Sequence, residues 1–142
     1  MFEIFYEDTK VLDFDPEFFR LWVVKILESE SKTPGDITVV FTSDAYLLNM
    51  NIEHLNHDYY TDIITFDYST DVISGDLFIS IDRVEENATL NNVSFLEEIY
   101  RVVAHGCLHL CGYKDKEPGD VVIMREKEDF AISLIVSRET KN

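Results

Sequence analysis

Residues 105–115 read His-Gly-Cys-Leu-His-Leu-Cys-Gly-Tyr-Lys-Asp, and they close a long segment whose apolar residues have helical spacing. On a helix, His105 and His109 lie one turn apart and project from the same face, about 6 Å apart at Cβ. Gly112 is the residue type that most easily adopts the left-handed conformation ending a helix. A short turn can then bring the carboxylate of Asp115 back toward the two imidazoles. The stretch predicts a helix that ends in a metal-chelating group.

Two neutral imidazoles and one carboxylate make a three-ligand site with a position open to water, which is typical of catalytic rather than structural zinc. We expect one Zn²⁺ per chain at His105, His109 and Asp115, and another divalent metal would also suit these ligands. Cys107 and Cys111 each lie two residues beyond a histidine, about 200° around the helix. We predict that they point away as small core residues. The alternatives are metal ligands or a redox pair for the cysteines, and surface or core residues for the histidines.

The pattern His-Gly-x-Leu-His-Leu-x-Gly-Tyr at residues 105–113 resembles the signature of the YbeY endoribonuclease family, the bacterial ribosomal RNA maturation factors. The likeness includes Asn51, Thr-Asp-Ile-Ile-Thr-Phe at residues 61–66 and Gly-Asp-Leu-Phe-Ile-Ser at residues 75–80. It covers roughly residues 48–116 in the family's order and spacing. The resemblance implies an α+β fold and hydrolysis of phosphodiester bonds in RNA.

Two positions depart from the family pattern. The resemblance implies a third histidine ligand where this chain has Asp115, and the negative charge of a carboxylate should make the metal a weaker Lewis acid. It also implies an arginine after Asn51, where this chain has Leu55. His57, two residues further on, is our candidate for contacting the phosphate substrate instead. It lies with His54 in a segment, residues 52–61, that we expect to be an ordered loop near the metal, although both histidines could equally be solvated.

Composition sets the size and the class of the protein. A chain of 142 residues with 46% hydrophobic content can bury one sizeable core but is short for two. It has no run of about 18 apolar residues, and its first residues lack the basic start and apolar block of a signal peptide. The two closely spaced cysteines do not form the disulfide framework of a secreted protein. We expect a soluble, cytoplasmic, non-membrane protein whose oligomeric state is open.

The net charge of −16 is unusual for a protein that binds nucleic acid. Such a chain should repel a polyanion at long range, and most nucleic-acid binders present a basic face. A metal ion is itself a strong local cation that a count of side chains omits. The acidic balance would also suit a basic protein partner.

Hydrophobic periodicity predicts alternating strands and helices. Residues 62–68 and 75–80 form two strands whose connection is too short for a crossover, so they should pair antiparallel. We expect an α+β fold, a single domain over residues 1–142, with a mixed sheet of about four strands packed against helices and a zincin-like metal helix. The predicted strands are residues 1–6, 37–42, 62–68 and 75–80, and the predicted helices are residues 16–29, 44–51, 82–90, 95–111 and 118–137.

The sequence also predicts which residues cap the helices, which could orient His105 and which side of the last helix is buried. Asp15 and Ser94 are predicted N-caps, the latter in a capping box with Glu97, and Asp82 is the predicted cap of the helix over residues 82–90. Glu98 and Arg101 precede His105 by two turns and one turn; either could orient its imidazole, and a solvated ion pair is the simpler interpretation. On the last helix the predicted buried side comprises Ile123, Met124, Lys127, Phe130, Ala131 and Leu134.

The residues predict metal-assisted hydrolysis, in which a bound divalent ion activates water. The spacing also resembles zinc proteases, but these carry a glutamate base directly after the first histidine, where this chain has Gly106. The YbeY resemblance implies a zinc-dependent, single-strand-specific endoribonuclease for ribosomal RNA maturation and ribosome quality control, with ribosomal RNA and the ribosome or ribosomal proteins as partners. The alternatives are a ribosome-associated or protein-binding factor with a structural or weakly active metal site, and a small metallohydrolase of another substrate such as peptide.

Overall fold

The structure is a computed structural model that describes the backbone of residues 1–140 and the side chains of residues 1–135. Within these residues strands and helices alternate, and the predicted α+β class is confirmed. In chain order the elements are β1 (Phe2–Glu7), α1 (Pro16–Ser29), β2 (Pro34–Thr42), α2 (Asp44–Leu55), β3 (Ile63–Asp67), β4 (Ile73–Ser80), α3 (Ile81–Leu90), α4 (Phe95–Leu110) and α5 (Pro118–Thr140).

The four strands form one mixed sheet in the order β1-β2-β4-β3. β1 and β4 both pair parallel with β2, whereas β3 pairs antiparallel with β4, as the short connection predicts. Alternate residues of β4 point into the core, with Leu77 and Ile79 fully buried. The sheet confirms the predicted mixed arrangement, with β3 as the edge strand next to the candidate site.

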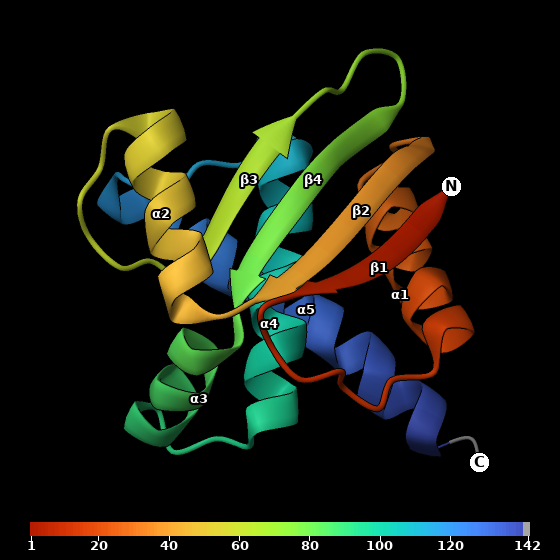
Figure 1. The fold of residues 1–142 in the computed structure, drawn as a ribbon. Coiled ribbons are helices and arrows are strands. Elements are labelled where there is room, and N and C mark those ends of the chain that lie inside the picture. The colour runs from red at the N-terminus through yellow and green to blue at the C-terminus, as the bar shows by residue number, and fades with distance from the viewer. Residues whose placement is uncertain (141–142) are drawn as a thin grey trace.

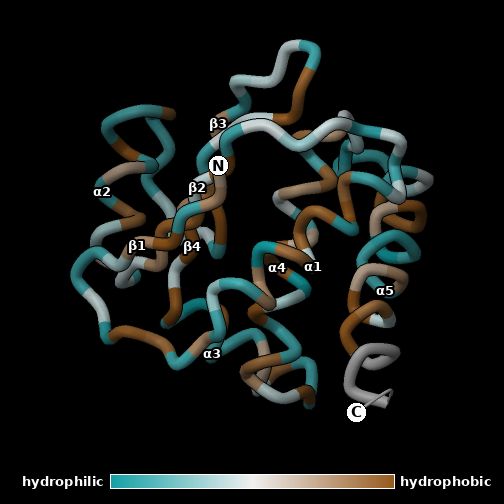
Figure 2. The backbone as a smooth tube through the Cα atoms, turned by 90° about the vertical axis from the view of Figure 1, so that its right-hand side faces the viewer, coloured by the Kyte–Doolittle hydropathy of each residue, from teal (hydrophilic) through white to brown (hydrophobic). Residues whose placement is uncertain are grey.

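The sheet lies between two helical layers (Figures 1 and 2). α2 lies on one side, and α1, α4 and α5 lie on the other. α4 packs directly on β3 and β4, and α5 packs on the far side of α4 (Figure 2). α4 is therefore the central helix, and side chains from the sheet and from α5 can both reach its last two turns.

α4 begins and ends where the sequence predicts. The Ser94 hydroxyl accepts a hydrogen bond from the Glu97 N–H at 3.0 Å, which caps the first turn. Gly106 lets the helix approach the sheet, because a Cβ at this position would lie 2.8 Å from Ile63 Cδ1 and 2.9 Å from Leu77 Cδ2. The position that carries the catalytic glutamate in zinc proteases is thus filled by the sheet.

Several element boundaries differ from the prediction. β2 begins at Pro34 instead of residue 37, with an irregular register between Pro34 and Ile37, and β4 begins at Ile73 instead of residue 75. α2 continues one turn past Asn51 to Leu55, because Asn56 takes the left-handed conformation (φ 55°) that ends it. The predicted loop is therefore shorter.

The predicted caps and faces of two helices also need correction. The N-cap of α3 is Ser80, whose hydroxyl accepts from the Arg83 N–H at 3.2 Å, and Asp82 instead accepts from the Asp44 N–H at 2.8 Å. α5 runs to Thr140, beyond the predicted end at residue 137, and residues 141–142 lie outside the described part. Of its predicted buried side, Ile123 and Phe130 are exposed; the buried residues are Met124, Glu128, Ala131 and Ile135.

Candidate metal centre

The last two turns of α4 hold two facing imidazoles. His105 and His109 lie one turn apart, and their Nε2 atoms are 2.9 Å from each other. Both side chains are partly buried, and their rings meet nearly at right angles. The one-turn spacing thus produces the predicted juxtaposition.

The turn after α4 brings in the third side chain. Gly112 has a φ of 105°, and the Tyr113 and Gly112 N–H groups donate to the carbonyls of Leu108 and His109, each at 3.0 Å. These two bonds form a Schellman motif, which reverses the chain. Asp115 Oδ2 then lies 3.0 Å from His105 Nε2 and 3.3 Å from His109 Nε2. Among the described residues, His105, His109 and Asp115, here called the triad, form the single group of three side chains arranged to hold a metal ion.

The hydrogen-bond partner of each Nδ1 atom determines which ring nitrogen of the two histidines carries the proton. His109 Nδ1 lies 2.8 Å from the carbonyl oxygen of Tyr113, which can only accept, so this nitrogen donates. His105 Nδ1 donates to Glu128 Oε2 at 2.7 Å. In the neutral rings, both Nε2 lone pairs therefore point toward Asp115, and three electron-rich atoms converge. Such an arrangement is repulsive without a cation and favourable around one.

The triad fits a tetrahedral metal ion by distance and by chemistry. Metal–ligand bonds of about 2.0–2.1 Å place two ligand atoms about 3.3 Å apart in tetrahedral geometry. The three distances in the triad are 2.9, 3.0 and 3.3 Å. Imidazole nitrogen and carboxylate oxygen are common zinc ligands, and three of them leave one position for water or substrate.

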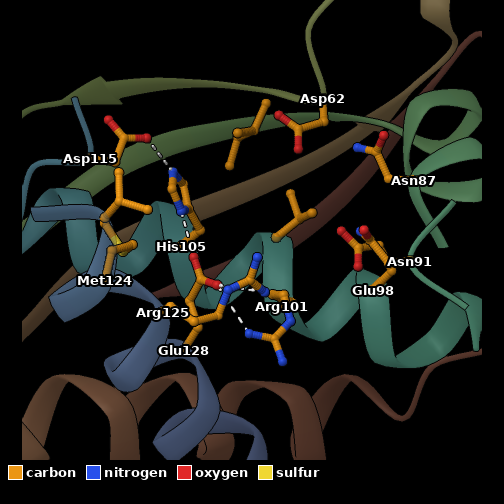
Figure 3. A pocket seen from close by; sticks show the side chains of 13 residues that line it. Asp62, Asn87, Asn91, Glu98, Arg101, His105, Asp115, Met124, Arg125 and Glu128 are labelled. Carbon is orange, nitrogen blue, oxygen red and sulfur yellow. Dashed lines mark hydrogen bonds and ion pairs between the residues drawn. The ribbon is translucent and has the colours of Figure 1, made fainter. Parts of the chain in front are cut away.

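Glu128 on α5 is a site residue that the sequence analysis missed. The residue is 6% exposed, and its carboxylate binds His105 through one oxygen and Arg101 Nη1 through the other, at 3.1 Å (Figure 3). Arg101 also pairs with Asp129 at 2.9 Å, so it does not form the predicted solvated pair with Glu98. A signal was present: Glu128 follows Met124 by one turn and precedes Ala131 by three residues, which makes it an acid on the buried face.

Electrostatics around His105 follow from these contacts. Burial opposes protonation of the ring, but the hydrogen bond to Glu128 and the negative charges of Glu128, Asp115 and Asp62 together outweigh it and raise the pKa of His105. Burial raises the pKa of the Asp62 and Glu98 carboxyls, whose side chains lie nearby. The region thus combines converging acceptors with acids that are difficult to ionise.

Two pockets flank the triad, and both reach His105 and Asp115. The first, of about 400 Å³, lies toward α3 and α5 and contains Glu98 (Figure 3). The second, of about 510 Å³, lies toward α2 and contains Leu55, His57 and Lys116. His57 therefore lines a pocket that also reaches the triad, and its own side chain is exposed.

A hydrogen bond from the buried side chain of Asn51 holds the loop that carries His57. Asn51 is buried, and its side-chain amide donates to the Tyr59 carbonyl at 2.9 Å. His57 and Tyr59 stack with ring centroids 5.1 Å apart and an angle of 20° between the ring planes. His54, by contrast, is not a lining residue of this pocket and packs its ring edge against Phe66.

The two cysteines point away from the triad, as predicted. Cys107 is fully buried in the core, and Cys111 is partly buried; both are free thiols. Burial raises the pKa of both, that of Cys111 to about 11. They remain protonated at neutral pH, which disfavours them as metal ligands.

Comparisons with known proteins agree with the motif. The family model described as Endoribonuclease YbeY matches residues 4–135. Proteins called Endoribonuclease YbeY are similar to the chain in Flavobacterium johnsoniae, with 49% identity over 91% of this chain and 93% of the relative, and in Cytophaga hutchinsonii, with 48% identity over 92% of each. The solution structure of TM1509 from Thermotoga maritima superimposes with a TM-score of 0.70 and 25% identity, covering 98% of this chain and 93% of that one.

Proposed function

The chain belongs to the Endoribonuclease YbeY family, and on that premise we propose that it is a zinc-dependent endoribonuclease specific for single-stranded RNA. Its substrate is ribosomal RNA during maturation and ribosome quality control, with the ribosome or ribosomal proteins as partners in the cytoplasm. The observation that carries the proposal is the triad, whose three electron-rich atoms converge within 3.3 Å beside two open pockets.

His105, His109 and Asp115 would hold the zinc ion. When bound there, the ion supplies the Lewis acidity that activates water and polarises a phosphodiester. Glu128 orients the His105 ring and keeps its proton on Nδ1. The Tyr113 carbonyl does the same for His109.

The pocket toward α2 is the proposed path of the RNA backbone. Lys116 is the single lysine or arginine among its described lining residues, and His57 lies in the same pocket. These two side chains can contact a phosphate, while Leu55, at the position of the family's arginine, offers no charge. The stacked His57–Tyr59 pair provides an aromatic surface of the kind on which unpaired bases stack.

Peptide hydrolysis is the weaker alternative, because the steric contacts of Gly106 leave no room for the glutamate base of zinc proteases. Amide cleavage would need another base beside the activated water.

No helix in the described part of the chain is long and apolar enough to cross a membrane.

The test is cleavage of a single-stranded ribosomal RNA precursor by the zinc-loaded protein, beside the same sequence in duplex form. We expect cleavage of the single strand by wild type and by His54→Ala, and loss of both activity and zinc in His109→Ala. His54 is the matched control because it is a histidine outside the triad. Stoichiometric zinc with no cleavage of any RNA would instead support a ribosome-binding factor, and peptide cleavage that depends on His109 would support the other alternative.

A further inference from the structure

We propose that the pocket toward α3, here called the Glu98 pocket, binds the base of the nucleotide next to the scissile phosphate and prefers guanine. The proposal rests on the proposed function, since it assigns the substrate preference of the same site. The pocket has a volume of about 400 Å³ and reaches His105 and Asp115 at one end and Glu98 at the other. A base held there would leave its phosphate beside the triad.

Glu98 is a buried acid whose carboxylate has no hydrogen-bond donor or ion-pair partner among the described residues. Glu98 is 5% exposed. The nearest arginine along the helix, Arg101, forms its ion pairs with Glu128 and Asp129 instead. Among the described residues, every side-chain nitrogen or oxygen that is fully enclosed has a hydrogen-bond partner. Because the oxygens of Glu98 have none, they are not fully enclosed, and they face the pocket that Glu98 lines. A buried and unpaired carboxylate lowers stability, and a ligand that donates hydrogen bonds to it removes that cost.

Glu98 and His105 lie on the same face of α4. They are seven residues apart (105 − 98), which is close to two full turns, so their side chains project from the same helix face. At 1.5 Å per residue the two positions are about 10 Å apart along the axis. This spacing is comparable to the span of one nucleotide from its phosphate to the hydrogen-bonding edge of its base. One nucleotide can therefore reach both ends of the pocket.

The chemistry of the pocket favours a donor-rich, neutral ligand. Asp62 lines it as a second acid, while the two arginines that also line it, Arg101 and Arg125, are paired with Glu128. A phosphate would be repelled by this excess of acceptors. The face of a base fits the apolar wall that Val102 and Met124 provide.

Guanine presents the edge that matches these groups. Its N1–H and N2–H₂ are adjacent donors that can both bind one carboxylate, here that of Glu98. The neighbouring O6 accepts, and Asn87 and Asn91 offer amide donors one helical turn apart on the rim (Figure 3). Adenine and cytosine place a ring nitrogen lone pair against the carboxylate, and uracil offers one donor between two acceptors. A buried polar site of this kind rejects ligands that leave it unpaired.

The test is a titration of the zinc-loaded protein with 5′-mononucleotides, followed through the methyl resonances of Met124 and Val102. We expect 5′-GMP to bind at least about tenfold more tightly than AMP, CMP or UMP, with IMP between them because it lacks the N2 amino group. Glu98→Gln should weaken GMP binding at least about tenfold and abolish the preference, whereas Glu98→Asp should retain part of it. Glu126→Gln, which removes an exposed acid of α5 outside the pocket, should bind GMP like wild type.

Equal affinities for the four nucleotides, or an unchanged GMP affinity in a folded Glu98→Gln protein, would overturn the proposal. Tighter binding of N-acetylarginine amide than of GMP would also overturn it and would identify a pocket for a cationic peptide side chain. Cleavage of single-stranded RNAs with one guanine at varied positions gives a second readout, with cuts beside the guanine in wild type but not in Glu98→Gln. If no RNA is cut, the proposed function fails, and the titration still decides the pocket.

Discussion

Asp115 places a carboxylate oxygen within 3.3 Å of both histidine Nε2 atoms, and this geometry leads to the first prediction. Asp115→Ala should lower the zinc content of purified protein by about an order of magnitude or more, because two imidazoles alone hold zinc weakly. Asp115→His should restore it, since an imidazole also suits the metal. Elemental analysis measures the content. Glu117→Ala, an exposed acid two residues away, is the control, and full zinc in Asp115→Ala would place the third ligand elsewhere.

Glu128 is the residue whose effect on the triad is indirect. In Glu128→Gln, the amide oxygen can accept from His105 or from Arg101, and the amide NH₂ then faces the other donor. We expect zinc affinity to fall about 10–100-fold, the range for loss of a hydrogen-bond partner of a metal ligand. Competition with a chromogenic chelator measures it. Asp129→Asn, which also loses an ion pair to Arg101 but does not contact His105, should keep wild-type affinity; equal losses in both variants would show a general effect of Arg101.

The packing of α4 against the sheet depends on Gly106. In Gly106→Ala the new methyl group would lie under 3 Å from Ile63 and Leu77, so overpacking should lower the free energy of unfolding by about 1–3 kcal/mol. The higher helix propensity of alanine offsets at most about 1 kcal/mol. Gly119→Ala, where nothing lies within 4 Å, should be neutral or stabilising. Urea denaturation measures the free energy of unfolding of both variants. Equal values for Gly106→Ala and Gly119→Ala would show that the sheet shifts to accommodate the methyl group.

The elements were predictable where local chemistry determines them. Ser94 and Gly112 fix the two ends of α4, so the helix and its histidines followed from sequence alone. The cap of α3 was misassigned because Ser80 and Asp82 both offer a capping oxygen, and their tertiary partners decide between them. Glu128 was missed because its spacing from Met124 and Ala131 can indicate burial on α5 but cannot indicate that α5 places it against His105 of α4.

The stability of the whole molecule should depend on pH through its buried acids. Burial raises the pKa of Asp62 and Glu98, so the folded chain retains protons that the unfolded chain releases. The free energy of unfolding attributable to these groups therefore falls as pH rises above about 4, the ordinary value for carboxyls, until the folded-state pKa is passed.

Glu98→Gln tests this dependence, because an amide carries no such penalty. Its stability relative to wild type should increase as pH rises from about 4 toward neutrality and then level off. Chemical denaturation across that range measures the difference, and Glu126→Gln controls for the loss of one surface charge. A constant difference at every pH would show that burial does not disfavour the Glu98 carboxylate.

The net charge of −16 predicts an unusual response to salt. A basic nuclease loses RNA affinity as salt rises, because salt screens attraction. Here salt screens repulsion between two polyanions, with a Debye length of about 10 Å at 0.1 M, so kcat/KM on RNA should rise between low salt and about 0.1 M. Initial rates over a potassium chloride series measure this. A steady fall from the lowest salt would mean that a local cationic surface dominates the approach.

The position of Glu128 on the last helix has a consequence for the order in which the protein is made. His105, His109 and Asp115 leave the ribosome before α5 does, so His105 acquires its carboxylate partner only after α5 has also emerged and packed against α4. Until then the imidazole is not oriented and the metal is held less firmly. Translation therefore produces the three ligands first and the residue that orients His105 afterwards.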